Sequence, residues 1–229
     1  MKQAILVVAF GSTVDSAREH QIDAVVNRIK EKYTDYEVRL AFSSRIIVKR
    51  LRDRGIEIPT EQGALDALIG EGYTDIYVQP LHFTGGEEFD KLKHNILNHE
   101  RAQELNTLRV GRPLVYYMGQ EEHPNDYQIL IDTFVTSLSV SNEDGLLLIG
   151  HGGLGSGNSA YGYLQYQLIR SGLNHIRVAT LENAPYVADI AVPWEWLDGK
   201  KPNKIYVHPL LLVLGDHALN DLFGDEEDS

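Results

Sequence analysis

The chain has 229 residues, of which 43% are hydrophobic and 24% are charged, so it can bury a core of ordinary globular size. Its formal net charge of −12 excludes proteins that rely on a broad basic surface, so we expect neither a nucleic-acid partner nor binding to an anionic membrane. The sequence contains no cysteine, which excludes disulfides and thiolate chemistry and leaves nitrogen and oxygen ligands for any metal.

The first apolar run, residues 4–10, precedes Gly11 and is typical of a strand buried on both faces of a parallel sheet. This run is too short for a signal peptide or a membrane span, so we expect a cytoplasmic protein. Further strands are expected at residues 37–42, 75–80, 108–117, 145–149, 176–181 and 204–214. Helical periodicity is found at residues 15–33, 45–53, 61–70, 87–99, 127–138 and 160–171. This alternation predicts an α/β fold with parallel sheets flanked by helices.

The two halves of the sequence resemble each other. The stretch IYVQPLHFTGGEEFDKL from Ile76 matches IYVHPLLLVLGDHALNDL from Ile205, with one residue inserted in the second. In the same way, the strand that ends before Phe10 matches the strand that ends before His151. We interpret these matches as an internal duplication in which each half holds its own small sheet.

The duplication predicts two similar lobes, with residues 1–120 in the first and residues 121–229 in the second. Ligands of open α/β sheets bind beyond the carboxyl ends of the strands. We therefore expect an active-site cleft between the two lobes, lined by the loops that follow the strands.

Three residues of the second half follow predicted strands. His151 comes after the strand at 145–149, Glu182 after the strand at 176–181, and His217 shortly after the last strand. Two imidazoles and one carboxylate form a recurring ligand set for a divalent metal, and they leave a coordination position open for a substrate. The pattern thus predicts a metal site at one edge of the second sheet.

The first half lacks this ligand set. Its matching positions are Phe10 for His151, approximately Ser43 for Glu182, and Glu88 for His217. His82 also follows a predicted strand and can face the cleft. The other histidines are interpreted as surface or structural residues: His20, His94, His99, His123, His175 and His208.

The glycine-rich segment at residues 150–157 follows a strand and precedes a helix, as phosphate-binding loops do. It fits neither the P-loop nor the dinucleotide-binding fingerprint. No G-x-S-x-G element is present, so Ser156 and Ser159 do not indicate a serine hydrolase. We interpret the glycines as letting the backbone approach a large flat ligand and leaving the His151 side chain uncrowded.

The clearest group of basic residues lies in the predicted helix at 45–53 and just beyond it. This basic cluster consists of Arg45, Lys49, Arg50, Arg52 and Arg54. An acidic protein that binds a polycarboxylate needs such a local concentration of positive charge, whereas a solvated helix face gives the same pattern. Both interpretations stay open.

The segments GHGG around His151, LEN around Glu182 and GDHALND around His217 resemble the anaerobic, class II sirohydrochlorin cobaltochelatases of the cobalamin pathway. In the first half, AILVVAFGST, AFSSRIIVKRLRDRGIEI and ALIGEGYTDIYVQPLHFTGGEEFDKL resemble the same family in the same order. The resemblance covers nearly the whole chain. Members of the family usually continue past the position of Ser229, so we expect a final helix to be missing.

The resemblance implies a chelatase fold of two α/β lobes that inserts Co²⁺, as substrate metal, into sirohydrochlorin without ATP or an organic cofactor. It implies that His151, Glu182 and His217 hold the metal and that His151 accepts a pyrrole proton. The macrocycle must lose two N–H protons as the metal enters, so the site needs a base and walls that bend the ring. Candidates for the wall that contacts the substrate are Phe10, Phe42, His82, Glu87 and Glu88.

Two alternatives to this function stay open. The same ligand set accepts Ni²⁺ or Fe²⁺, so a chelatase for either ion fits the sequence. A carrier that holds a tetrapyrrole or a metal without transferring it fits as well. A homo-oligomer is possible, although no coiled-coil pattern specifies one.

Overall fold

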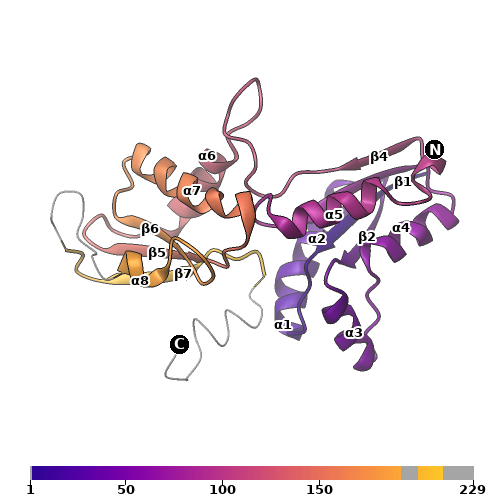
Figure 1. The fold of residues 1–229 in the computed structure, drawn as a ribbon, viewed down its shortest axis with the longest axis horizontal. Helices are drawn as coiled ribbons and strands as arrows, with labels where there is room; N and C mark the ends of the chain where they lie inside the picture. The colour runs from indigo at the N-terminus through magenta and orange to yellow at the C-terminus, as the bar shows by residue number, and fades with distance from the viewer. Residues whose placement is uncertain (1, 192–200, 214–229) are drawn as a thin grey trace. The chain divides into compact units, whose positions relative to one another are not determined.

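The computed structural model describes residues 2–191 and 201–213, which form two compact units (Figure 1). Unit 1 contains residues 2–83, 88–113 and 212–213, and unit 2 contains residues 84–87, 114–191 and 201–211. The chain therefore passes from one unit to the other more than once, whereas the sequence suggested a single boundary between residues 120 and 121.

Unit 1 contains a parallel sheet with strands in the order β2-β1-β3-β4. These strands are β1 (Gln3–Ala9), β2 (Glu37–Phe42), β3 (Asp75–Leu81) and β4 (Thr107–Val110). Residues 4–9 of the central strand β1 are all buried, as expected for a strand covered on both faces. Its side chains alternate between two hydrophobic clusters, so the unit has a core on each side of the sheet.

Helices cover both faces of this sheet (Figure 1). They are α1 (Asp15–Ala17), a π-helical turn (Arg18–Ile22), α2 (Asp23–Lys32), α3 (Arg45–Asp53), α4 (Glu61–Gly70), α5 (Glu87–Leu97) and a 3-10 turn (Ala102–Glu104). One cluster includes Leu68 of α4 and Leu92 of α5. The other includes Val26 of α2 and Leu51 of α3. The helices expected from periodicity are thus present, and their apolar faces account for the core.

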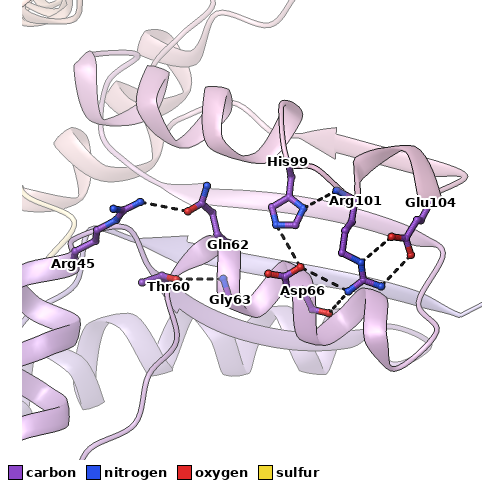
Figure 2. Close-up of polar contacts among 8 residues, drawn as sticks. All are labelled: Arg45, Thr60, Gln62, Gly63, Asp66, His99, Arg101 and Glu104. Atoms are coloured by element: carbon purple, nitrogen blue, oxygen red, sulfur yellow. Dashed lines mark hydrogen bonds and ion pairs between the residues drawn. The ribbon is translucent and has the colours of Figure 1, made fainter.

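Polar contacts fix α4 against the segment that follows α5 (Figure 2). His99 Nε2 lies 3.5 Å from Asp66 Oδ1, and His99 Nδ1 accepts a hydrogen bond from Arg101 N at 3.3 Å. Arg101 also donates to Asp66 O at 3.3 Å and pairs with Glu104 Oε1 at 2.8 Å. These contacts account for His99 without a functional role.

Members of the basic cluster contact neighbouring side chains. Arg54 donates to both carboxylate oxygens of Asp15 at 2.8 Å. Arg45 donates to Gln62 Oε1 at 3.4 Å, as Figure 2 shows. Both arginines remain exposed, and these contacts favour the interpretation of the cluster as a solvated helix face.

Unit 2 contains a smaller parallel sheet with strands in the order β6-β5-β7. Its strands are β5 (Gly145–Gly150), β6 (Ile176–Thr180) and β7 (Ile205–Pro209). Its helical segments are α6 (Asp126–Leu130), a π-helical turn (Ile131–Val135), two 3-10 turns (Thr136–Leu138 and Gly155–Asn158), α7 (Ser159–Arg170) and α8 (Val187–Ala191). The sequence did not predict α8.

No helix within the described parts of either unit is long and apolar enough to cross a membrane.

The two sheets share one plan, because β2-β1-β3 of unit 1 corresponds in order to β6-β5-β7 of unit 2. Hydrogen bonds beyond the strand ends give the correspondence residue by residue. Ser44 N donates to Phe10 O at 3.2 Å, and Glu182 N donates to His151 O at 2.9 Å. Ser44 is therefore the counterpart of Glu182, and the expected counterpart, Ser43, is wrong by one residue.

Unit 1 contains an insertion relative to unit 2. Phe42 N donates to Pro59 O at 3.0 Å, and Thr180 N donates to Pro185 O at 2.8 Å, so these contacts correspond. In unit 1 the chain from Phe42 to Pro59 includes α3, whereas in unit 2 only residues 181–184 lie between Thr180 and Pro185. The loop that carries Glu182 is thus short and is closed against its own strand.

Two expected strands end early. The strand expected at residues 108–117 ends at Val110, and further along the chain Tyr116 N and Tyr117 N donate to Asp126 Oδ2 at 3.2 and 2.9 Å. The strand expected at 204–214 ends at Pro209, and Val213 packs against a core cluster of unit 1. Val213 is thus explained by packing outside the sheet, whereas Leu114 and Tyr116 are exposed.

Phe42, expected to contact the substrate, is fully buried in the core of unit 1, so its ring offers no surface to a ligand. We expect Phe42→Ala to lower the free energy of unfolding by about 3–5 kcal/mol, because it removes a buried ring and leaves a cavity. Phe10→Ala is the control, since this residue is 45% exposed and loss of its ring should cost about 1 kcal/mol or less. Urea denaturation of both variants measures the difference, and equal losses would contradict the core role of Phe42.

Candidate metal centre

Two of the three expected ligands lie side by side at the carboxyl edge of the unit 2 sheet. His151 directly follows β5 and Glu182 follows β6, and these strands are parallel neighbours. His151 Nδ1 and Glu182 Oε2 are 3.9 Å apart. This distance exceeds a hydrogen bond and shows that the imidazole and the carboxylate lie beside each other, so both side chains can turn towards one ion. The third expected ligand, His217, lies outside the described residues.

The two side chains are open to solvent, since 40% of the His151 side chain and 55% of the Glu182 side chain are exposed. Within the described residues, no group of three His, Asp or Glu side chains is placed to hold a metal ion. The described part of the centre therefore contains two candidate ligands, and an ion from solution can reach them.

A backbone contact orients the His151 ring. His151 Nδ1 lies 3.1 Å from Gly152 O. A carbonyl oxygen only accepts hydrogen bonds, so this contact requires the proton on Nδ1 and places the ring lone pair on Nε2. Metal-binding histidines commonly donate their second N–H to a backbone carbonyl in this way. The geometry thus favours Nε2 as the metal-binding atom.

The glycines on either side of His151 are required by neighbouring protein atoms. A Cβ at Gly150 would overlap the Tyr161 ring, and a Cβ at Gly152 would overlap the Glu182 carbonyl oxygen. Gly152 also has a φ of 84°, which disfavours other residues. Burial raises the pKa of Tyr161, and a hydrogen bond with the Gly152 backbone opposes that shift. These two glycines are therefore explained by packing within unit 2 and not by the approach of a ligand.

The sequence did not indicate the residues that shape the Glu182 loop. Thr180 Oγ1 donates to Asn183 O at 2.7 Å, and Asn183 Nδ2 donates to Gly153 O at 3.3 Å. Asn183 has a φ of 64°, a conformation that asparagine tolerates better than most residues. An asparagine directly after a candidate ligand is the one signal that could have suggested this turn.

The expected substrate-contacting residues lie in different surroundings. Phe10 directly follows β1 and is half-exposed, and Glu87 at the start of α5 is exposed. Glu88 Oε1 pairs with Lys91 Nζ at 3.1 Å on the surface of α5. Phe10, Glu87 and Glu88 can thus meet a ligand from solution, unlike Phe42.

His82 is a buried histidine whose side chain is not satisfied. It follows β3, is 9% exposed, and neither ring nitrogen has a hydrogen-bond partner within the described residues. Loss of hydration lowers the pKa of His82 to about 4, and the charge of Glu88 opposes this shift. His82 is therefore neutral at physiological pH.

The low pKa of His82 predicts loss of stability in acid. Folded His82 takes up a proton near pH 4 and unfolded His82 near 6.5, so between these values the unfolded state binds more protons. Stability should fall as pH drops from 6.5 towards 4, with a His82 contribution of about 3 kcal/mol at most. Urea unfolding of wild type and His82→Gln across this range measures it. His20→Gln, on an exposed residue, is the control, and an unchanged pH slope in His82→Gln would contradict the prediction.

Comparison with known proteins places the whole chain in one family. The family model described as cobalt chelatase (CbiK) matches residues 3–229. A sirohydrochlorin cobaltochelatase of Salmonella typhimurium is 32% identical over 232 positions, covering 100% of this chain and 83% of that protein. Sirohydrochlorin cobaltochelatase CbiKC of Nitratidesulfovibrio vulgaris is 27% identical over 230 positions, covering 100% of this chain and 78% of that protein.

The fold has a counterpart among solved structures. SirB from Bacillus subtilis with Fe³⁺ superposes with a TM-score of 0.65 at 18% identity, covering 95% of this chain and 80% of that one. At this identity the likeness concerns the fold, and it confirms the expected chelatase-like α/β architecture. The family match extends over nearly every residue, including the segments around His151 and Glu182. The chain belongs to the CbiK family of cobalt chelatases.

Proposed function

We propose that the protein inserts Co²⁺ into sirohydrochlorin, a metal-free tetrapyrrole, in anaerobic cobalamin biosynthesis. The observation that carries this proposal is the juxtaposition of His151 and Glu182, 3.9 Å apart at the ends of neighbouring strands. Two relatives that align with the whole chain bear the name sirohydrochlorin cobaltochelatase, which supports the choice of metal and macrocycle. We further propose that the reaction needs neither ATP nor an organic cofactor.

The proposed ligands are His151 through Nε2, Glu182 through its carboxylate, and His217. Glu182 supplies the negative charge that attracts the cation, and the two imidazoles supply neutral nitrogen donors. Three protein ligands leave coordination positions that the macrocycle nitrogens can occupy. The exposure of the His151 and Glu182 side chains supports this role, because the incoming ion and macrocycle must reach them.

Proton transfer accompanies the exchange of ligands. The free macrocycle loses two N–H protons as Co²⁺ enters, so the metallated macrocycle keeps the net charge of the free one and two protons are released. His151 Nε2 uses the same lone pair to bind Co²⁺ or a proton. Once the ion has moved to the macrocycle nitrogens, that lone pair can accept a pyrrole proton and pass it to water. His151 thus acts first as a ligand and then as a proton acceptor.

Four of the expected substrate-contacting residues remain in the proposal. Phe10 offers a half-exposed aromatic face to a flat conjugated ring. Glu87 and Glu88 are acidic groups that polar atoms of the substrate can contact. His82 is buried, so its unsatisfied ring nitrogens would gain a partner from a substrate polar group only after its side chain had moved to the surface. Phe42 is left out because its ring is buried.

The ligand set is tested by anaerobic visible absorbance of the protein with sirohydrochlorin and Co²⁺, in buffer without ATP. We expect His151→Ala, Glu182→Ala and His217→Ala each to lower the insertion rate by on the order of 100-fold or more, because each removes a metal ligand. Glu182→Gln should also lose activity, since it keeps the size but removes the charge. His20→Ala, on an exposed helical residue, is the control and should retain the wild-type rate. Wild-type rates in all three alanine variants would refute the ligand assignment.

The same assay separates the alternatives. Faster turnover with Ni²⁺ or Fe²⁺ than with Co²⁺, at equal free ion concentrations, would assign the chain to another metal. Tight stoichiometric binding of tetrapyrrole without acceleration over the protein-free reaction would indicate a carrier. Turnover with Co²⁺ that is faster than with Ni²⁺ or Fe²⁺, and faster than the protein-free reaction, would establish the proposed activity.

A further inference from the structure

We propose that Asn158 is a positioning residue that fixes the loops carrying His151 and Glu182 relative to each other, so that both side chains can bind one metal ion. This inference rests on the ligand roles proposed above. Asn158 Oδ1 accepts a hydrogen bond from Gly153 N at 3.2 Å, and Asn158 Nδ2 donates to Ala184 O. One side chain therefore bridges the two loops that carry the ligands, on the carboxyl side of each ligand.

The bridge closes a ring of contacts around the metal ligands. On the strand side, Glu182 N donates to His151 O at 2.9 Å. On the opposite side, the loops are joined by Asn158 and by the hydrogen bond from Asn183 Nδ2 to Gly153 O. Fixing both loops on both sides of the ligands restricts the backbone from which each ligand side chain projects.

Asn158 itself has a rigid support. It is the last residue of the 3-10 turn at 155–158, directly before α7. Within unit 2, Gly157 packs against Gly86 so closely that a Cβ on Gly157 would overlap Gly86 Cα. Ser159 Oγ donates to Ser156 O at 2.6 Å across the same turn. The turn is therefore fixed by the Gly157–Gly86 contact and by the Ser159–Ser156 hydrogen bond, so Asn158 presents its amide from a fixed position.

The chemistry of the bridge calls for an amide. The two loops present one N–H, from Gly153, and one carbonyl oxygen, from Ala184. An asparagine satisfies both, because its amide has an acceptor oxygen and a donor nitrogen. An aspartate would accept from Gly153 but face the Ala184 carbonyl with a second acceptor. A leucine of similar size makes neither contact and leaves the charge unchanged.

The expected consequence of losing the bridge is weaker metal binding. Residues that orient metal ligands typically change metal affinity by about 10–100-fold when they are replaced. We therefore expect Asn158→Leu and Asn158→Ala to raise the KM and the Kd for Co²⁺ by about 10-fold or more. The KM for sirohydrochlorin, and kcat at saturating Co²⁺, should stay within about twofold of wild type, because the ligands and the base are still present.

The experiment uses the full chain and a matched control in the same unit. Asn125 caps α6 by accepting from Gln128 N at 3.1 Å and makes no contact with either ligand loop among the hydrogen bonds of the described residues. Asn125→Ala should lower thermal stability through loss of the cap and leave Co²⁺ binding unchanged. Initial rates against Co²⁺ concentration, calorimetric Co²⁺ titration without tetrapyrrole, and melting temperature are measured for all variants.

The outcomes distinguish failure of the positioning role of Asn158 from failure of the ligand roles of His151 and Glu182. Weaker Co²⁺ binding in both Asn158 variants, with normal binding in Asn125→Ala, supports the positioning role. Wild-type Co²⁺ affinity in either folded Asn158 variant overturns it, and Asn158→Ala decides if Asn158→Leu does not fold. Wild-type Co²⁺ binding and turnover in His151→Ala and Glu182→Ala would instead refute the ligand assignment, whatever the Asn158 variants show.

Discussion

One backbone hydrogen bond, from Glu182 N to His151 O at 2.9 Å, sets the geometry of the candidate metal centre. It continues the pairing of β5 with β6 past the ends of both strands, so the two residues leave the sheet side by side. This close approach of the two loops requires a glycine at position 152, since any Cβ there would overlap the Glu182 carbonyl oxygen. The separation of the two side chains therefore follows from the register of two parallel strands.

The same contact occurs in unit 1 without the same chemistry, because it joins Ser44 N to Phe10 O. The duplicated fold thus supplies equivalent positions in both units, and the residue types at those positions determine what each unit can bind. Unit 1 carries the phenyl ring of Phe10 where unit 2 carries the imidazole of His151. It also carries α3 as an insertion where unit 2 has the short loop that holds Glu182. A short loop leaves its ligand less freedom than a long one would.

The sequence predicted the strands, their parallel pairing and the two strand-end residues, because apolar runs and duplication report burial and topology directly. It did not predict where an apolar run leaves its sheet, as at Val213, since hydrophobicity reports burial but not the partner. Phe42 was assigned to the wrong surroundings for the same reason. Gly150 is required by the nearby ring of Tyr161, and Asn158 acts through a hydrogen bond to Ala184. No sequence pattern encodes such contacts between residues that are far apart in the chain.

The contrast between rigid loops and open side chains fits a protein that transfers its metal. A structural metal site closes its ligands around the ion, and a chelatase must release the ion to a competing set of nitrogens. Here the backbones of both loops are fixed by hydrogen bonds on two sides, whereas the His151 and Glu182 side chains are 40% and 55% exposed. Fixed backbones favour capture of the ion, because little conformational freedom is lost on binding. Exposed side chains would allow the two proposed ligands to rotate away as the ion leaves, so the backbone would serve capture and the side chains would serve release.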